Sequence, residues 1–323
     1  MAAGEVSLGQ QKVALRSRGH LGRAWSRLIR KKLAVACMSV LVLLYAGGVL
    51  APWVAPYDYD RPDYTAFREG PSWDHWAGTD RAGRDMLTRL LWGIQNTVIL
   101  TLTAMATGSL VIGISLGLIA GYFGGKVDAI INRVGEVFSS FPDIFLIIIL
   151  AATLKPRILE WVRWLEDNTF VDGLVKTGVV DYAVVFLALV AFSWIGMARL
   201  VRAQVLQLKE SQYVDAARAM GASTPRILFR HVLPNAISPI IVTVSMGMGT
   251  MVGTEIILGW LGLGIQPPRP SLGTMLFEGG VSLQIVRNTP WLLLGPGIIA
   301  WLMILSWNLL GDALNDVLNP RTR

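Results

Sequence analysis

The sequence predicts an all-α integral membrane protein with six membrane-spanning helices and both termini on the cytoplasmic side. Composition is the first indication: hydrophobic residues make up 53% of the 323 residues and charged residues only 16%, against about 25% charged in soluble domains. The second is that charged residues are absent from several long segments. The third is the uneven distribution of Lys and Arg between the two sides of these segments.

Five segments contain no charged residue, and each approaches or exceeds the length that crosses about 30 Å of hydrocarbon. These segments are residues 33–51, 97–122, 182–198, 237–254 and 291–310. The fourth continues past Glu255, so we place that span at 237–258.

A sixth span is expected at about 137–154. Its apolar run FLIIILAATL is too hydrophobic to leave in water, and Asp143 lies inside the span or at its cytoplasmic edge. The predicted organisation is a basic cytoplasmic segment at 1–32, followed by one six-span domain at 33–323.

The orientation follows from the basic residues. With the N-terminus inside, 18 Lys and Arg residues lie on the cytoplasmic side and 11 on the other, as the positive-inside rule requires. The clearest group abuts the first span and consists of Arg23, Arg27, Arg30, Lys31 and Lys32. Four tryptophans fall at the predicted outer ends of spans, where an interfacial aromatic belt is expected: Trp53, Trp92, Trp260 and Trp291.

Two functional classes are disfavoured. The net charge of +7 does not indicate nucleic-acid binding, because the basic residues flank membrane spans and lack interleaved aromatic residues. The chain has no GxxxxGK[ST] phosphate loop, and its three histidines lie in separate loops without a metal-binding motif. We therefore expect no nucleic-acid partner, no catalytic site and no metal site in this chain.

The segment 211–235 predicts two short helices broken at Gly221. An apolar stripe at i, i+3, i+4 and i+7 is formed by Tyr213, Ala216, Ala217 and Met220. Gly221 is expected to end the first helix in a left-handed conformation. Thr224 and Pro225 then begin a second helix, which Pro234 ends. From pattern alone, an amphipathic hairpin resting on the membrane is an equally good interpretation.

This segment resembles the EAA loop of bacterial ABC importer permeases, which docks on the ATPase subunit. The matching positions are Asp215, Ala216, Ala217, Gly221, Leu233 and Pro234. One departure is Asp215, where the family usually has glutamate. The shorter side chain keeps the charge but reduces its reach by one methylene.

Three further segments resemble the C-type permeases of the dipeptide, oligopeptide and nickel importers. They are GTDRAGRDMLTRLLWG at 78–93, LGLGIQPPRPSLGTML at 261–276 and GDALNDVLNPR at 311–321. The resemblance implies the type I permease fold of ABC importers and a location in the bacterial inner membrane. It also implies three kinds of partner: a second, homologous permease, two ATP-binding subunits that hold ATP and Mg²⁺, and an extracytoplasmic solute-binding protein.

Di- or oligopeptides are the cargo implied by this resemblance, with nickel complexes or oligosaccharides as alternatives. A secondary transporter or channel that needs no ATPase is the alternative from a different class. Glu255 and Asp143 are candidate pathway or gate residues, because ionisable groups inside a membrane usually face a protein interior or a wet cavity. Each could instead only hold a helix end at the interface.

Outside the third span, residues 155–181 predict an amphipathic helix on the outer leaflet. Its apolar positions are Ile158, Trp161, Val162 and Leu165. Contact with the binding protein or the partner permease is the alternative. Within the second span, Ser109, Gly113, Gly117 and Gly121 recur every four residues and predict close packing of another helix.

Overall fold

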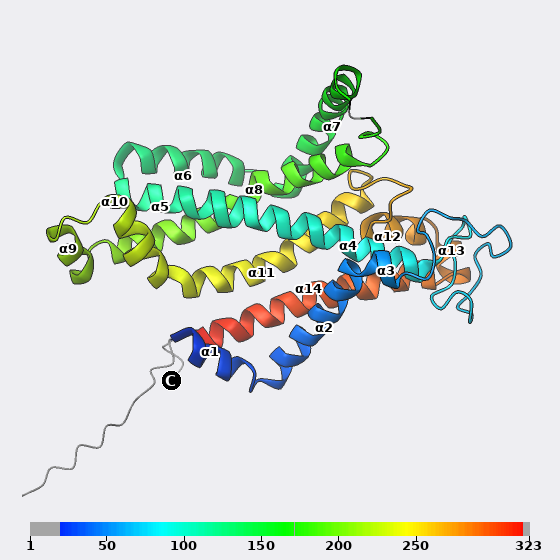
Figure 1. Cartoon of the computed structure of the whole chain (residues 1–323), viewed down its shortest axis with the longest axis horizontal. Helices are drawn as coiled ribbons and strands as arrows, with labels where there is room; N and C mark the ends of the chain where they lie inside the picture. The colour runs from blue at the N-terminus through cyan, green and yellow to red at the C-terminus, as the bar shows by residue number, and fades with distance from the viewer. Residues whose placement is uncertain (1–19, 171, 319–323) are drawn as a thin grey trace, which may run out of the picture.

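The structure, a computed structural model, describes residues 20–170 and 172–318 and is an elongated bundle of helices (Figure 1). Five long apolar helices run along the described part of the bundle (Figure 1). They are α2 (Lys32–Val49), Met86–Phe123, α8 (Val179–Leu208), α11 (Leu233–Trp260) and α14 (Trp291–Leu318). The helix Met86–Phe123 comprises α4 (Met86–Ala104), the π-helical η1 (Met105–Gly113) and α5 (Ile114–Phe123). The all-α membrane class is thus confirmed.

The two ends of the bundle differ in content. One end, here called the α9 end, carries α9 (Gln212–Ala219) and α10 (Thr224–Arg226). Helix α1 (His20–Leu28) and the last turns of α14 lie towards the same end, where Lys31 and Asp316 form a 2.8 Å salt bridge (Figure 1). The opposite α12 end carries residues 55–85, α3 (Ala51–Val54), α12 (Leu272–Gly280) and α13 (Leu283–Asn288). Residues 1–19 of the predicted N-terminal segment and 319–321 of the closing motif lie outside the described residues.

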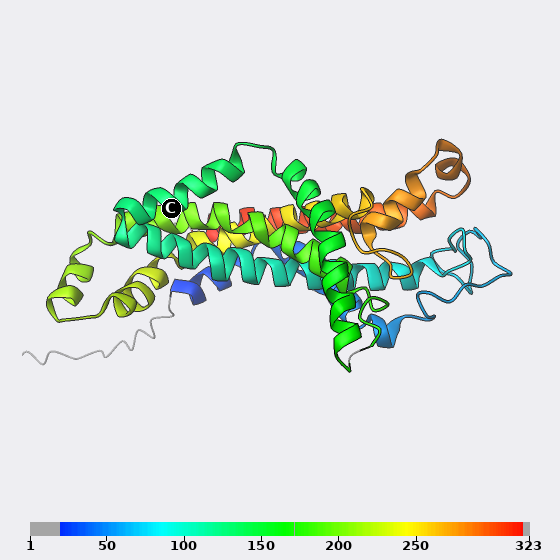
Figure 2. The same ribbon diagram turned by 90° about the horizontal axis from the view of Figure 1, so that it is seen from above.

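The sixth span expected at about 137–154 is not one continuous helix, because the chain bends within it. Helix α6 (Gly125–Ser139) packs along α5, whereas α7 (Asp143–Asn168) turns away from it by 90° (Figure 2). The break contains Pro142. A proline disfavours helical dihedral angles in the residue before it, here Phe141, so the helix stops and restarts in a new direction.

The amphipathic helix predicted within residues 155–181 is the second half of α7, which ends at Asn168. The helix continues through Pro156, at the cost of one backbone hydrogen bond. Continuity is favoured because Val162 is buried in the core and Ile158 and Leu159 pack against it. These apolar contacts span the proline and hold both halves against α8.

The predicted helix end at Pro234 was also wrong. The chain stays helical from α10 through the π-helical η2 (Ile227–Val232) into α11, and Pro234 lies in the first turn of α11. A proline ring clashes with the carbonyl group four residues earlier in a regular α-helix. The wider π-helical turn just before Pro234 makes room for the ring, so the helix is not interrupted.

The glycine stripe of the second span packs within the chain, as predicted. A Cβ atom on Gly117 would lie 2.7 Å from the carbonyl oxygen of Ala198, and one on Gly121 would lie 2.6 Å from Cβ of Val205. Such distances are too short for any side chain. The bare backbone of the stripe therefore lets α5 and α8 approach closely and form the centre of the bundle.

Candidate functional site

Helix α9 ends with a complete glycine cap. Gly221 has φ +79°, as predicted, its N–H donates to the carbonyl of Arg218, and the N–H of Ala222 donates to that of Ala217, both at 3.0 Å. This is the Schellman arrangement. No atom lies within 4 Å of a Cβ placed on Gly221, so backbone conformation alone, and not lack of space, requires glycine here.

The buried face of α9 differs from the predicted stripe. Val214 and Ala217 are buried, and Val214 packs in a cluster with Ile227, Leu228 and other residues of η2 and the spans. Of the four predicted stripe residues only Ala217 faces inward. A helix of eight residues has room for one short inward row at i and i+3, and the β-branched Val214 occupies it.

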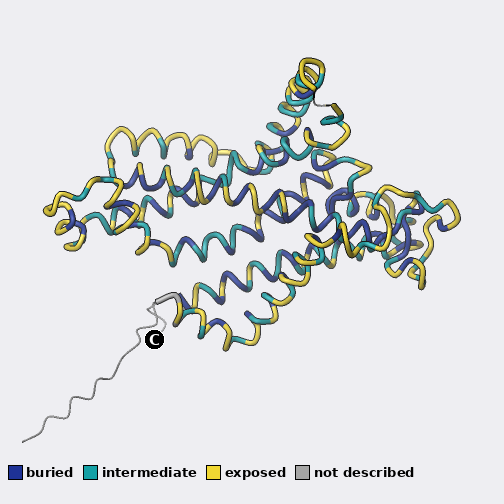
Figure 3. The backbone as a smooth tube through the Cα atoms, viewed as in Figure 1, coloured by how far each residue is buried: buried dark blue, intermediate teal, exposed yellow. Residues whose placement is uncertain are grey.

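The remaining members of the predicted stripe form an exposed apolar surface, here called the α9 stripe: Tyr213, Ala216 and Met220. Met220 is 82% exposed, and Figure 3 shows exposed residues along the outside of this end. Asp215 pairs with Arg218 at 3.1 Å, but both side chains are largely exposed, so the pair contributes little stability. Leu233 and Pro234 lie in the first turn of α11, next to η2.

Asp143 stands at a cavity between the helices. The cavity has a volume of ≈ 240 Å³ and is bounded by η1, α7, α8 and α11. Among the residues that the structure describes, Asp143, the first residue of α7, is the only ionisable one that lines it. Five hydroxyl side chains also line it, namely Ser109, Ser193, Thr243, Thr250 and Thr254. The cavity can therefore offer hydrogen bonds along its length and one negative charge.

Glu255 has a different environment. It is 0% exposed and does not line the Asp143 cavity. Thr97 of α4 donates a 2.8 Å hydrogen bond to its carboxylate, and Ser271, the N-cap residue of α12, donates one at 3.4 Å. Glu255 thus joins α11, α4 and α12. This geometry favours the interpretation in which Glu255 holds helices together.

A buried charge network at the α12 end was missed by the sequence analysis. The Asp80 carboxylate accepts hydrogen bonds from the N–H of Ala82 at 2.7 Å, from Arg84 Nε at 2.8 Å and from Arg89. Arg89 is 1% exposed and also contacts Glu278 of α12 at 3.4 Å. Burial raises the pKa of Asp80, but the guanidinium group of Arg89 and the N–H groups of the loop outweigh it, so the pKa is lowered overall.

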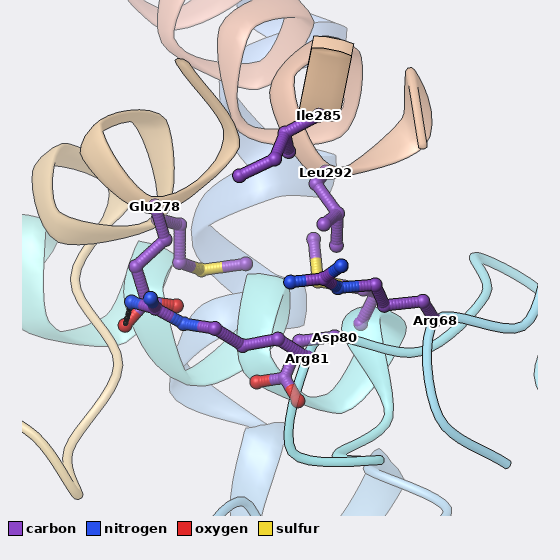
Figure 4. A pocket seen from close by; sticks show the side chains of 8 residues that line it. Arg68, Asp80, Arg81, Glu278, Ile285 and Leu292 are labelled. Atoms are coloured by element: carbon purple, nitrogen blue, oxygen red, sulfur yellow. Dashed lines mark ion pairs between the residues drawn. The ribbon is translucent and has the colours of Figure 1, made fainter. Parts of the chain in front are cut away.

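This network borders a small pocket (Figure 4). Arg81 reaches Glu278 at 3.6 Å, and the Arg68 side chain points into the same space. The motif at 78–93 contained a signal for the turn that places Asp80 in this network. An aspartate followed by Gly83 predicts a turn that the aspartate side chain can bond, and Gly83 has φ +76°.

Side chains from the spans also fix the loop 261–271. Asn96 of α4 donates a 2.7 Å hydrogen bond to the carbonyl of Pro270. Asp181 of α8 accepts one from the N–H of Gln266 at 3.1 Å and pairs with Lys155 of α7 at 2.8 Å. The α12 end is therefore tied to α4, α7 and α8 by polar contacts.

Comparison with known proteins adds a family context. Residues 113–323 match the family described as binding-protein-dependent transport system inner membrane component, and residues 20–71 match the N-terminal transmembrane domain of oligopeptide transport permease C. The chain is 34% identical to a dipeptide transport system permease protein of Alkalihalophilus pseudofirmus and 37% identical to a glutathione transport system permease protein of Pectobacterium atrosepticum. Both alignments cover 93% of this chain and 90% of the relative. It is 33% identical to an oligopeptide transport system permease protein of Bacillus subtilis, over 97% of this chain and 93% of the relative.

Proposed function

The chain belongs to the family of binding-protein-dependent transport system inner membrane components, and we propose that it forms half of the translocation pathway of an ATP-driven peptide importer. It is a multi-pass permease of the inner membrane, in a family whose members work with ATPase and binding-protein subunits. We propose that its own partners are one homologous permease, two ATP-binding subunits and one solute-binding protein. ATP and Mg²⁺ are held by the ATP-binding subunits, and this chain catalyses no reaction itself.

The observation that carries the proposal is the form of α9. Helix α9 packs against the bundle through Val214 and Ala217 on one side. On its other side it presents the exposed α9 stripe. An amphipathic helix with an apolar outer face fits a hydrophobic groove of a partner. We propose that the ATP-binding subunit supplies this groove, and that its movement during ATP hydrolysis is passed through η2 to α11, which continues from the same helix.

The Asp143 cavity supports the choice of peptide cargo. Its hydroxyl groups can hydrogen-bond to peptide N–H and carbonyl groups, and the carboxylate can pair with the positively charged amino terminus. The second permease would complete the wall of this pathway. Nickel complexes and oligosaccharides are alternative cargoes, but an uncharged sugar can only donate hydrogen bonds to the Asp143 carboxylate and cannot form an ion pair with it.

Orientation follows from these roles. We propose that the α9 end faces the cytoplasm, where ATP is available, and that the α12 end faces outward and receives the loaded binding protein. The distribution of Lys and Arg supports the same orientation.

Substitution of Met220 tests the coupling role of α9. The side chain is largely exposed, so Met220→Glu leaves the isolated chain folded while placing a charge in the proposed apolar contact. The matched control is Leu283→Glu in α13, an 89% exposed residue at the opposite end. The complex is purified through a tag on this chain, and the yield of ATP-binding subunits and the hydrolysis stimulated by loaded binding protein are measured.

We expect Met220→Glu to lower the recovery of ATP-binding subunits by about tenfold, the effect of losing one central apolar contact, and Leu283→Glu to leave it unchanged. Equal recovery from both variants would contradict the docking role of α9. Transport driven by an ion gradient in vesicles that hold this chain alone would instead support the secondary transporter.

A further inference from the structure

The junction of α1 and α2 carries an exposed apolar row. Trp25, Ile29 and Leu33 follow one another at intervals of four residues across the break between the two helices, and Trp25 is 57% exposed. On the opposite side, Leu28 and Ala34 are buried. They pack in one cluster with residues of α14, namely Leu310, Ala313 and Val317. The junction is therefore fixed to the bundle on one side and uncovered by the described chain on the other.

Exposed basic residues alternate in the sequence with the apolar residues of this row. Arg27, Arg30 and Lys32 are exposed, and none forms a salt bridge within residues 20–170 and 172–318. Their neighbour Lys31 is paired with Asp316 of α14. Within residues 20–170 and 172–318, the acidic groups of α14 at this end are Asp312 and Asp316, which are fewer than the four cations of the junction. The uncovered side of the junction is both apolar and positively charged.

The surface next to the junction indicates that lipid covers its exposed side. Leu33 lies in the first turn of α2, a membrane span whose outer face carries further exposed apolar residues such as Val42 and Leu43. The row at the junction thus continues into a surface made for lipid chains. A tryptophan and several cations at the end of such a surface match the composition of the membrane–water interface.

We infer that the junction of α1 and α2 binds anionic phospholipid. Arg27, Arg30 and Lys32 pair with the headgroup phosphates, while Trp25 and Ile29 insert at the boundary between headgroups and acyl chains. This goes beyond the transport function, because it assigns a lipid-binding surface independent of the ATP-binding subunits and of cargo. It also predicts that salt weakens the lipid contact, since exposed charges are screened.

The first experiment measures lipid binding by the purified full-length chain. Phosphatidylglycerol or phosphatidylcholine is titrated into the detergent-solubilised protein, and bound lipids are counted by native mass spectrometry. We compare the wild type with Arg27→Gln/Arg30→Gln/Lys32→Gln. The matched control is Arg61→Gln/Arg157→Gln/Arg287→Gln, which removes three exposed cations elsewhere.

We expect the wild type to prefer phosphatidylglycerol, and the junction variant to lose affinity for it by on the order of 100-fold, because each cation near an anionic surface contributes about fivefold. The control variant should keep the wild-type preference. Equal phosphatidylglycerol binding by the wild type and the junction variant would overturn the inference.

A second experiment asks what covers the row in the assembled complex. Cys37 is the only cysteine of the chain, so a Cys37→Ser background allows a nitroxide label at Trp25→Cys. In lipid bilayers, we expect the label to be accessible to membrane-dissolved oxygen. A label shielded from oxygen would mean that a partner subunit covers the row, and the lipid assignment would fail whether or not α9 couples to ATP hydrolysis.

Discussion

The short helix α9 and the long helix α11 finish with the same type of glycine cap at opposite ends of the molecule. The two ends are nevertheless held in place by different interactions. Gly221 at the α9 end and Gly262 at the α12 end both have φ +79° and both complete a Schellman arrangement. At the α12 end, the surrounding loops are tied to the spans by buried charges. At the α9 end, the contacts that hold the short helix to the rest of the described chain are apolar.

This difference separates a fixed end from a displaceable one. The α12 end contains Asp80, Arg89 and Glu278 in one network, and moving any member leaves a charge without its partner in a poorly solvated place. The α9 helix buries only Val214 and Ala217, and its Asp215–Arg218 pair is exposed. Apolar contacts lack the charge pairing of the network at the other end, so we expect displacement of α9 to cost less free energy than displacement of the α12 end.

The largest effect that would test this comparison is expected for Arg89→Leu. The substitution leaves Asp80 and Glu278 without their shared cation and should lower the free energy of unfolding by about 3–5 kcal/mol. The matched substitution at the other end, Arg218→Leu, removes an exposed pair and should cost less than about 1 kcal/mol. Thermal unfolding measures the loss of stability in both variants, and limited proteolysis of residues 55–85 measures the loosening of the α12 end. Equal losses would mean that the charge network does not fix the α12 end.

An intermediate effect is expected for valine at the two caps. A β-branched residue in the left-handed conformation costs about 1–2 kcal/mol, and both sites have open space around the missing Cβ. Gly221→Val should therefore reduce the recovery of ATP-binding subunits, whereas Gly262→Val should leave that recovery intact and increase proteolysis of the loop 261–271. If both variants lost the ATP-binding subunits, the effect of substituting a capping glycine would not be confined to its own end of the molecule.

The smallest effect is expected for Glu255→Gln. Glutamine can still accept a hydrogen bond from Thr97 and can donate one to Ser271, so α4, α11 and α12 should stay joined and the loss of stability should be below about 1 kcal/mol. Uptake by the assembled complex should remain close to that of the wild type. A large loss of uptake with normal assembly would place Glu255 in the pathway and would revise the structural role described above.

Several properties were determined by the sequence alone. Long uncharged segments in a lipid bilayer must satisfy their backbone hydrogen bonds internally, so they form helices whatever their neighbours are. Gly221 ends α9 because its conformation is a local backbone requirement. The glycine stripe of the second span predicted a close helix contact for a similar reason, because the absence of side chains is visible in the sequence.

Only the tertiary structure decided the rest. The continuity of α7 through Pro156 depends on contacts with α8, which outweigh the local preference of this proline. The partners of Glu255 and Arg89 come from distant parts of the chain: Thr97 is 158 positions from Glu255, and Glu278 is 189 positions from Arg89. Periodicity describes neighbours along one helix. It therefore cannot show which distant helix a charged side chain contacts. Those contacts decide whether the charge lines a cavity, as that of Asp143 does, or holds helices together.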